Sequence, residues 1–121
     1  QRDAYYDPTS VTPEMLAGYA TPLKVEDWDA ALLRILAGPG LGGKALTAAE
    51  ISGISVPVAI LWGENDTWVP IASGERLREL LPEAAWYTYP ETGHLPMEEH
   101  PADFNRDLLS FVAQEVSQNE S

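Results

Sequence analysis

Two apolar, strand-like runs in the second half of the chain each end in a short polar turn, and this arrangement most constrains the fold. The first run covers residues 56–62 and precedes a turn that contains Asp66. The second covers residues 84–90 and precedes a glycine turn that contains His94. β-Branched and aromatic runs between turn formers are typical of strands. The nearly continuous apolar character of the first run is typical of a parallel strand buried on both faces.

A helix is predicted after each strand. Pro70 begins one helical segment, which Pro82 ends, and Pro101 begins the last one. The last helix carries one apolar stripe, formed by Phe104, Leu108, Phe111 and Val112. The order β-α-β-α with short loops predicts an α/β fold in which a right-handed crossover joins parallel strands. The polar tail, residues 117–121, is expected to fray.

Residues 1–50 differ from the rest because prolines divide them into short segments, and we expect them to form a segment separate from residues 51–121. Thr12 is a good N-cap and Pro13 suits the first helical position, so a short helix is predicted there. A second helix is predicted over about residues 25–36, where apolar residues recur at the helical period.

The glycines of residues 38–43 precede Lys44 but do not form a phosphate-binding loop. No strand precedes them, and Ala45 stands directly after the lysine, where a phosphate-binding loop has serine or threonine. A flexible connector is the better interpretation of this stretch.

Composition excludes several classes of partner and chemistry. The chain has 121 residues, 19 acidic against 7 basic, and a net charge of −12. Nucleic acids and anionic membrane surfaces would be repelled, so we expect neither as a partner. The absence of cysteine excludes disulfides, thiolate nucleophiles and cysteine-based zinc sites. No apolar run approaches the roughly 18 residues of a spanning helix. Cysteine usage leaves the compartment open, and the cytoplasm is favoured.

Asp66 and His94 are the candidate site residues. Ligands of parallel α/β sheets lie beyond the carboxyl ends of the strands, and both residues follow such ends. Taken singly, Asp66 resembles an ordinary turn residue and His94 a surface histidine. Their order, an acid, then a histidine, then a closing helix, matches the final part of a nucleophile–acid–histidine triad. Glu64 is the second candidate for the acid.

Two motifs then carry a resemblance to a known family. Residues 56–70, VPVAILWGENDTWVP, closely resemble the penultimate-strand signature of α/β-hydrolase fold proteins. Residues 91–101, ETGHLPMEEHP, resemble the same family's terminal histidine segment. Residues 1–50 resemble, less specifically, the end of the helical cap of these enzymes. The resemblance implies that Asp66 is the triad acid and His94 the general base of a hydrolase that acts on an ester or related bond of a small molecule, without metal or cofactor.

The nucleophile of such a triad is missing from the sequence. Residues 53–57 come nearest to the G-x-S-x-G elbow, but Pro57 stands at the closing glycine and Ser55 precedes a strand instead of following one. The chain is therefore expected to be the C-terminal part of a larger hydrolase, inactive alone, that pairs with the missing N-terminal portion or with itself. The alternative is a catalytically inactive α/β module that pairs with another chain.

The resemblance is compatible with more than one substrate and nucleophile. The substrate is not identified, and the nucleophile of the parent enzyme is either serine or aspartate. Ester, C–C bond and epoxide hydrolases all fit the same ending. Glu98 and Glu99 are expected to cap or solvate the last helix, and His100 is expected to lie at its N-terminus.

Overall fold

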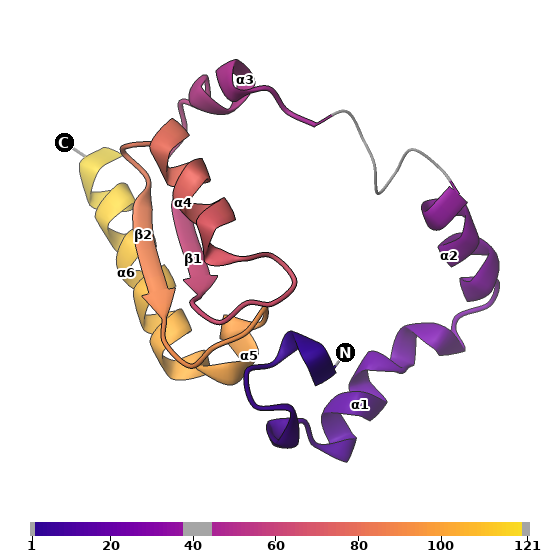
Figure 1. Ribbon diagram of the computed structural model, residues 1–121. Helices are drawn as coiled ribbons and strands as arrows, with labels where there is room; N and C mark the ends of the chain where they lie inside the picture. Colours follow the sequence, from indigo (N-terminus) through magenta and orange to yellow (C-terminus); the bar gives the residue numbers. More distant parts are fainter. Residues whose placement is uncertain (1, 38–44, 120–121) are drawn as a thin grey trace. The chain divides into compact units, whose positions relative to one another are not determined.

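The computed structural model describes residues 2–37 and 45–119, which form two compact units (Figure 1). One unit contains residues 2–10 together with residues from 48 onward, and the other begins at residue 11 and ends at residue 47. The sequence pattern predicted one segment for residues 1–50, whereas the structure groups residues 2–10 with the later unit. The glycine-rich stretch interpreted as a connector lies outside the described residues.

A two-stranded parallel sheet organises the first unit. Strand β1 (Ala59–Gly63) pairs with strand β2 (Ala85–Tyr89), and the register aligns the first residues and the last residues of the two strands. The predicted parallel pairing is thus present. β1 begins three residues later than predicted, because Pro57 has no N–H for the ladder and the first interstrand bond runs from Ala85 N–H to the Val58 carbonyl, 2.9 Å.

Helix α4 (Ile71–Leu80) packs on the face of the sheet that carries two tryptophans (Figure 1). Trp62 and Trp86 occupy alternate positions of the register that share this face. A Cβ atom added at Gly74 of α4 would lie 2.9 Å from both indole side chains, so the helix can approach this closely only at a glycine. The Trp62 indole N–H donates to the Val69 carbonyl, 3.1 Å, which ties the loop before α4 to the strand.

Helix α6 (Pro101–Asn119) packs on the opposite face. Tyr89, at the end of β2, packs its ring against Phe104 with 6.2 Å between the centroids, and its hydroxyl donates to Asp107 Oδ2 at 3.2 Å. The predicted apolar stripe is covered only in part, since Phe104 is half-buried and Leu108 is exposed. α6 includes residues 117–119 of the tail that was expected to fray.

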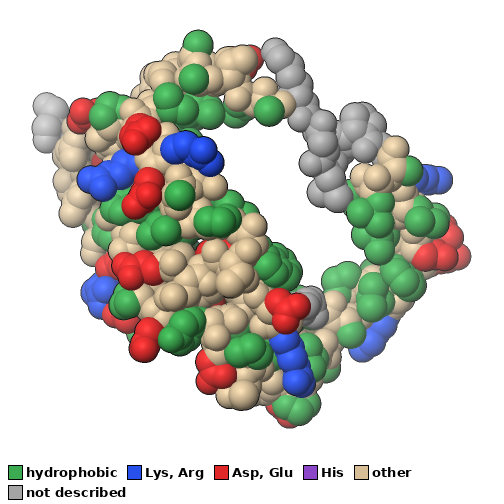
Figure 2. Space-filling view, viewed as in Figure 1, with side chains coloured by type: hydrophobic (Ala, Val, Ile, Leu, Met, Phe, Trp, Pro, Cys, Tyr) green, Lys and Arg blue, Asp and Glu red, His purple; other side chains and the backbone are tan. Residues whose placement is uncertain are grey.

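The second unit is helical, as predicted. α1 (Pro13–Tyr19) begins after Thr12, whose hydroxyl accepts the Met15 N–H at 3.2 Å. α2 (Trp28–Ala37) begins three residues later than expected, because Asp27 has a left-handed backbone with φ of 59° and cannot continue a helix. Figure 2 shows hydrophobic side chains gathered over α2. The exposed members are Trp28, Leu32, Leu33, Ile35 and Leu36.

Five short elements were not predicted. Each is at most five residues long, too short for a periodic pattern to show. They are the 3₁₀ turns η1 (Arg2–Ala4), η2 (Pro8–Ser10) and η3 (Thr21–Lys24), and the helices α3 (Ala48–Ser52) and α5 (Pro96–Glu99).

The turns that follow β1 and β2 meet at Gly63. A Cβ atom at Gly63 would lie 2.6 Å from the Thr92 carbonyl oxygen and closer still to the next carbonyl oxygen along the chain. The Asn65 N–H donates to that Thr92 carbonyl at 2.9 Å, and the Glu64 N–H donates to the Tyr89 carbonyl at 2.9 Å. Main-chain contacts therefore join the two turns that carry the candidate site residues.

We predict that Gly63→Ala lowers the free energy of unfolding by about 2–3 kcal/mol, because the added methyl group forces two backbone segments apart. Urea unfolding followed by tryptophan fluorescence would measure the loss, since Trp62 and Trp86 both lie in this unit. Gly18→Ala is the control. It lies in α1 with nothing within 4 Å of its added Cβ, and should not lower the stability. An unchanged stability for Gly63→Ala would contradict the close packing of the turns.

We also predict an alkaline loss of stability that depends on Tyr89. Burial, together with the hydrogen bond and negative charge of Asp107, raises the pKa of the Tyr89 phenol from 10.0 to about 12. In the unfolded chain the phenol ionises near its ordinary pKa. The burial and hydrogen bond of the neutral phenol therefore contribute fully to the stability of the folded state below that pKa, and this contribution to stability is lost as the pH rises toward 12. Between about pH 8 and about pH 11, wild type should lose about 1 kcal/mol more stability than Tyr89→Phe. Equal losses of stability in wild type and Tyr89→Phe would show that folding does not raise the pKa of the phenol.

Candidate active site

Asp66 and His94 lie side by side at the carboxyl ends of the two strands. Asp66 stands three residues beyond the end of β1, and His94 stands in the turn after β2. His94 Nδ1 is 2.7 Å from Asp66 Oδ2. The parallel pairing brings the two turns to the same edge of the sheet, so the structure places the two predicted site residues in one hydrogen-bonded pair.

Both carboxylate oxygens of Asp66 are occupied. Oδ1 accepts the main-chain N–H groups of Trp68 at 2.8 Å and Val69 at 2.9 Å, which leaves Oδ2 for the imidazole of His94. Only 5% of the Asp66 side chain is exposed. The local turn bonds that make Asp66 resemble an ordinary turn residue are therefore the bonds that aim its second oxygen at His94.

The contact with Asp66 determines the form of the neutral imidazole. An ionised carboxylate can only accept hydrogen bonds, so Nδ1 of His94 carries the proton and donates it. Nε2 is then left with a free lone pair. A ring in this tautomer can take a proton from a hydroxyl group at Nε2, and the carboxylate stabilises the imidazolium that results. The His94 side chain is 36% exposed, whereas the aspartate is enclosed.

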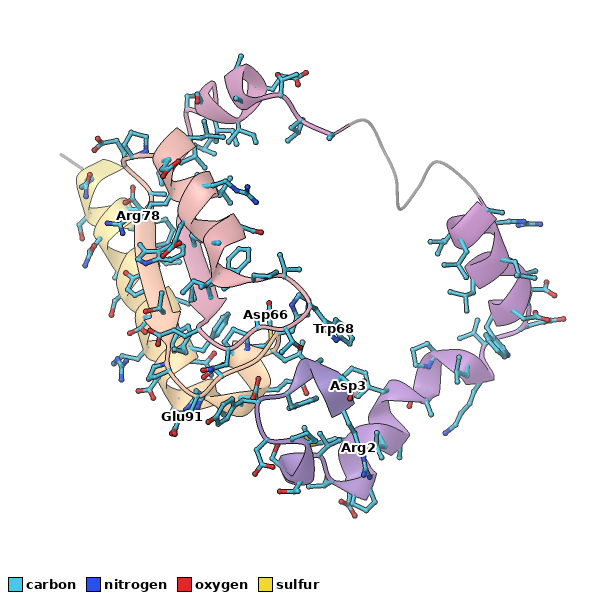
Figure 3. All side chains as sticks on the ribbon, viewed as in Figure 1. Arg2, Asp3, Asp66, Trp68, Arg78 and Glu91 are labelled. Carbon is cyan, nitrogen blue, oxygen red and sulfur yellow. The ribbon has the colours of Figure 1, made fainter. Side chains whose placement is uncertain are left out.

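Trp68 lies against His94 and was not among the residues predicted for the site. The two ring centroids are 5.2 Å apart with an interplanar angle of 40°, and Trp68 is 53% exposed. Asp66 and Trp68 are both on the loop that follows β1, and Asp3 lies on the N-terminal segment beside that loop (Figure 3). The Thr67 hydroxyl donates to the Asp3 carbonyl at 3.3 Å. A large aromatic residue within a polar turn was the signal in the sequence that could have identified Trp68.

The turn that carries His94 is tightly held. Glu91 has a left-handed backbone with φ of 50°, which reverses the chain after β2. Thr92 follows and is fully buried, and its hydroxyl donates to the Pro90 carbonyl at 2.8 Å. The His94 N–H donates to the Ala4 carbonyl at 2.6 Å, so the N-terminal segment is packed directly on the histidine backbone.

The expectation that Glu98 and Glu99 cap or solvate the last helix was wrong for Glu99, whereas Glu98 is exposed. Glu99 accepts two main-chain N–H groups instead, that of Gly93 at Oε1, 2.8 Å, and that of Tyr6 at Oε2, 2.7 Å. Glu98 accepts a hydrogen bond from the hydroxyl of Tyr5. Both carboxylates thus face the N-terminal segment, a long-range contact for which the sequence contains no periodic signal.

The remaining candidates lie apart from the pair. Glu64, the rival for the acid role, is exposed, and its main-chain N–H donates to the Tyr89 carbonyl between the turns. His100 stands between α5 and α6, where its carbonyl accepts the Phe104 N–H at 2.9 Å, as expected for a residue at a helix N-terminus. In the part of the chain that the structure describes, no group of three or more acidic, histidine or cysteine side chains could hold a metal.

A cavity of about 250 Å³ lies near the amino end of β1, at the other end of the strand. Its lining is mostly apolar and includes Ile54, Val56, Leu80 and Leu81. It lacks an acid–imidazole pair, so we do not assign the site there. Among the described residues, no helix combines the length and the apolar character needed to cross a membrane.

Comparison with known proteins supports the same fold. The uncharacterized hydrolase YugF of Bacillus subtilis is 29% identical over 107 residues, which is 88% of this chain and 38% of that protein. A pimeloyl-[acyl-carrier protein] methyl ester esterase of Chromobacterium violaceum is 36% identical over 78 residues, 64% of this chain and 31% of the esterase. A 2-hydroxy-6-oxononadienedioate/2-hydroxy-6-oxononatrienedioate hydrolase of a Pseudomonas species is 33% identical over 72 residues, 60% of this chain and 25% of the hydrolase.

Solved structures agree. A variant of the meta-cleavage product hydrolase CumD from Pseudomonas fluorescens superposes with a TM-score of 0.80 at 23% identity, over 93% of this chain and 42% of that one. CarC, a serine hydrolase involved in carbazole degradation, gives a TM-score of 0.76 at 26% identity, over 86% of this chain and 41% of that one. The chain therefore spans less than half the length of these relatives. Residues 1–107 match the profile of the α/β hydrolase family, and the chain belongs to this family.

Proposed function

We propose that this chain supplies the acid, Asp66, and the general base, His94, of a nucleophile–His–Asp triad in an α/β-fold hydrolase. The observation that carries the proposal is the 2.7 Å contact between His94 Nδ1 and an oxygen of the buried Asp66 carboxylate. This contact fixes the imidazole tautomer that a triad requires. In the same proposal, the helical segment predicted over residues 1–50 is the end of a cap.

In the proposed reaction Nε2 of His94 takes the proton of a nucleophilic hydroxyl as that oxygen attacks the substrate. The imidazolium, stabilised by Asp66, then returns the proton to the leaving group. If the parent's nucleophile is an aspartate, His94 activates a water molecule instead, which attacks the covalent intermediate.

The nucleophile is proposed to come from residues outside these 121. Ser55, in the nearest approach to a nucleophile elbow, precedes β1, whereas His94 lies beyond the carboxyl ends of the strands. Five residues of strand span roughly 16 Å, so Ser55 and His94 are at opposite ends of the sheet.

The names of the relatives suggest a substrate class. One is named for a methyl ester and another for a 6-oxo acid, and both compounds contain a carbonyl group. We propose a small carbonyl compound, an ester or a ketone with a cleavable neighbouring bond, as the substrate. The serine hydrolase among the similar structures favours serine over aspartate as the nucleophile.

The alternative is an inactive α/β module that pairs with another chain or with a second copy of itself. The exposed apolar side chains over α2 and along α6 favour a partner in either case, because they would be covered on pairing. Activity therefore distinguishes the two functions, whereas association alone does not.

We predict that the 121-residue chain hydrolyses activated esters no faster than its His94→Ala variant. Joined to a nucleophile-bearing α/β-hydrolase portion, covalently or in trans, it should support turnover. Asp66→Asn should then lower kcat by about 10⁴-fold, because the amide favours the wrong imidazole tautomer. Glu64→Gln is the matched control, two residues away and exposed, and should leave kcat unchanged.

Two outcomes would contradict this proposal. Turnover by the chain alone that a single serine substitution abolishes would place the nucleophile within the chain. A stable complex with the nucleophile-bearing portion that still lacks turnover would favour the inactive module.

A further inference from the structure

We propose that Glu99 is a positioning residue for His94, acting through the main chain of the turn that carries the imidazole. The inference rests on the proposed function, since it assigns Glu99 a part in holding the general base. It also identifies the N-terminal segment, residues 3–6, as a structural support of the site.

Glu99 links two segments that are far apart in the sequence. Its Oε1 accepts the N–H of Gly93, immediately before the histidine, and its Oε2 accepts the N–H of Tyr6. Hydrogen bonds from main-chain N–H groups to a carboxylate are charge-assisted and stronger than those between neutral groups. One side chain therefore fixes the start of the histidine turn and the end of the N-terminal segment together.

The Gly93 N–H depends on this carboxylate. Gly93 is buried, so its N–H requires a partner within the protein. A Cβ atom at Gly93 would lie 2.9 Å from the Tyr6 nitrogen and closer still to the Ala4 carbonyl oxygen, which shows how tightly the two backbones are packed. Glu99 is thus the side chain that satisfies a buried donor where the segments meet.

The next peptide unit is held by the N-terminal segment itself. The His94 N–H donates to the Ala4 carbonyl at 2.6 Å, and the residues around this carbonyl, Ala4 and Tyr5, are buried. Successive N–H groups of Gly93 and His94 are therefore bound by Glu99 and by the segment that Glu99 anchors. Because the direction of a side chain follows from its backbone, these bonds set the direction in which the imidazole reaches Asp66.

Glu98 provides a matched comparison. It is the neighbouring carboxylate and holds the same segment through the Tyr5 hydroxyl, without contacting the Gly93 N–H. Glu98→Gln therefore tests the anchoring of the segment alone, whereas Glu99→Gln tests the histidine turn as well. A glutamine at position 99 has one accepting oxygen, and its NH₂ group would face the second N–H.

Hydrogen exchange measured by NMR on the 121-residue chain tests whether Glu99 positions His94. The sequence has two histidines, so a His100→Gln variant assigns the imidazole signals. In Glu99→Gln, exchange of the Gly93 amide and of the His94 Nδ1–H should accelerate by about tenfold or more, the change that follows from losing a hydrogen bond to a charged group. In Glu98→Gln the His94 Nδ1–H should exchange as in wild type, because the amide oxygen of glutamine can still accept the single hydrogen bond from Tyr5.

The amides of β1 and β2 separate positioning from a general loss of stability. If Glu99 positions His94, exchange of these strand amides stays unchanged in Glu99→Gln. Equal acceleration throughout the unit, or an unchanged His94 Nδ1–H, would overturn the inference. Should Glu99→Gln fail to fold, Glu99→Asp keeps the charge but is one methylene too short to reach both N–H groups, and the same comparison applies to it.

Failure of this inference differs from failure of the proposed function. The exchange measurement needs no nucleophile, so it reports on the His94 turn whether or not hydrolysis is ever restored. Turnover with an unchanged His94 signal in Glu99→Gln would remove the role of Glu99 alone. Exchange that follows the prediction without turnover would remove the proposed hydrolysis and leave the positioning intact.

Discussion

The parallel pairing of β1 with β2 is the constraint on which the site depends. Parallel strands present their carboxyl ends at the same edge, so the turn after each strand begins beside the other. Gly63 then permits an approach that a Cβ atom would prevent, and main-chain bonds from the first turn reach the second. The contact between Asp66 and His94 follows from this backbone arrangement and does not create it.

Asp66 shows that an ordinary turn residue and a candidate catalytic acid can be the same residue for one physical reason. A carboxylate that accepts two N–H groups from its own loop has a fixed plane, and its second oxygen then has a defined direction. The cost of burying a charge is offset by three hydrogen bonds, one of them to the imidazole. Local structure therefore supplies the rigidity that general base catalysis needs, because a displaced imidazole loses its alignment with the proton that it must take.

The sequence predicted the helices and strands whose apolar residues recur at a clear period. It also predicted residues whose position follows from the chemistry of a local turn. The order of strands and long helices, the N-cap at Thr12 and the pair of candidate site residues all belong to this group. The predicted boundaries of the elements were less accurate. β1 begins after Pro57, and α2 begins after Asp27, which has a left-handed backbone, so each element begins three residues later than predicted. The contacts of Glu99 could not be predicted, because both are made to main-chain N–H groups, which any amino acid except proline can supply. The one to Tyr6 also joins residues 93 positions apart.

The exposed apolar surfaces follow from the same physics that explains the site. Parallel sheets are normally covered on both faces and contain several strands, whereas the described sheet has two. Leu108 on α6 and Val56 before β1 are exposed although the sequence pattern predicted burial. Relatives in which this region is less than half of the chain have further protein to place against such surfaces. In the proposed function, the nucleophile for His94 comes from such further protein. Under that proposal, the same further protein covers the apolar surfaces and completes the triad.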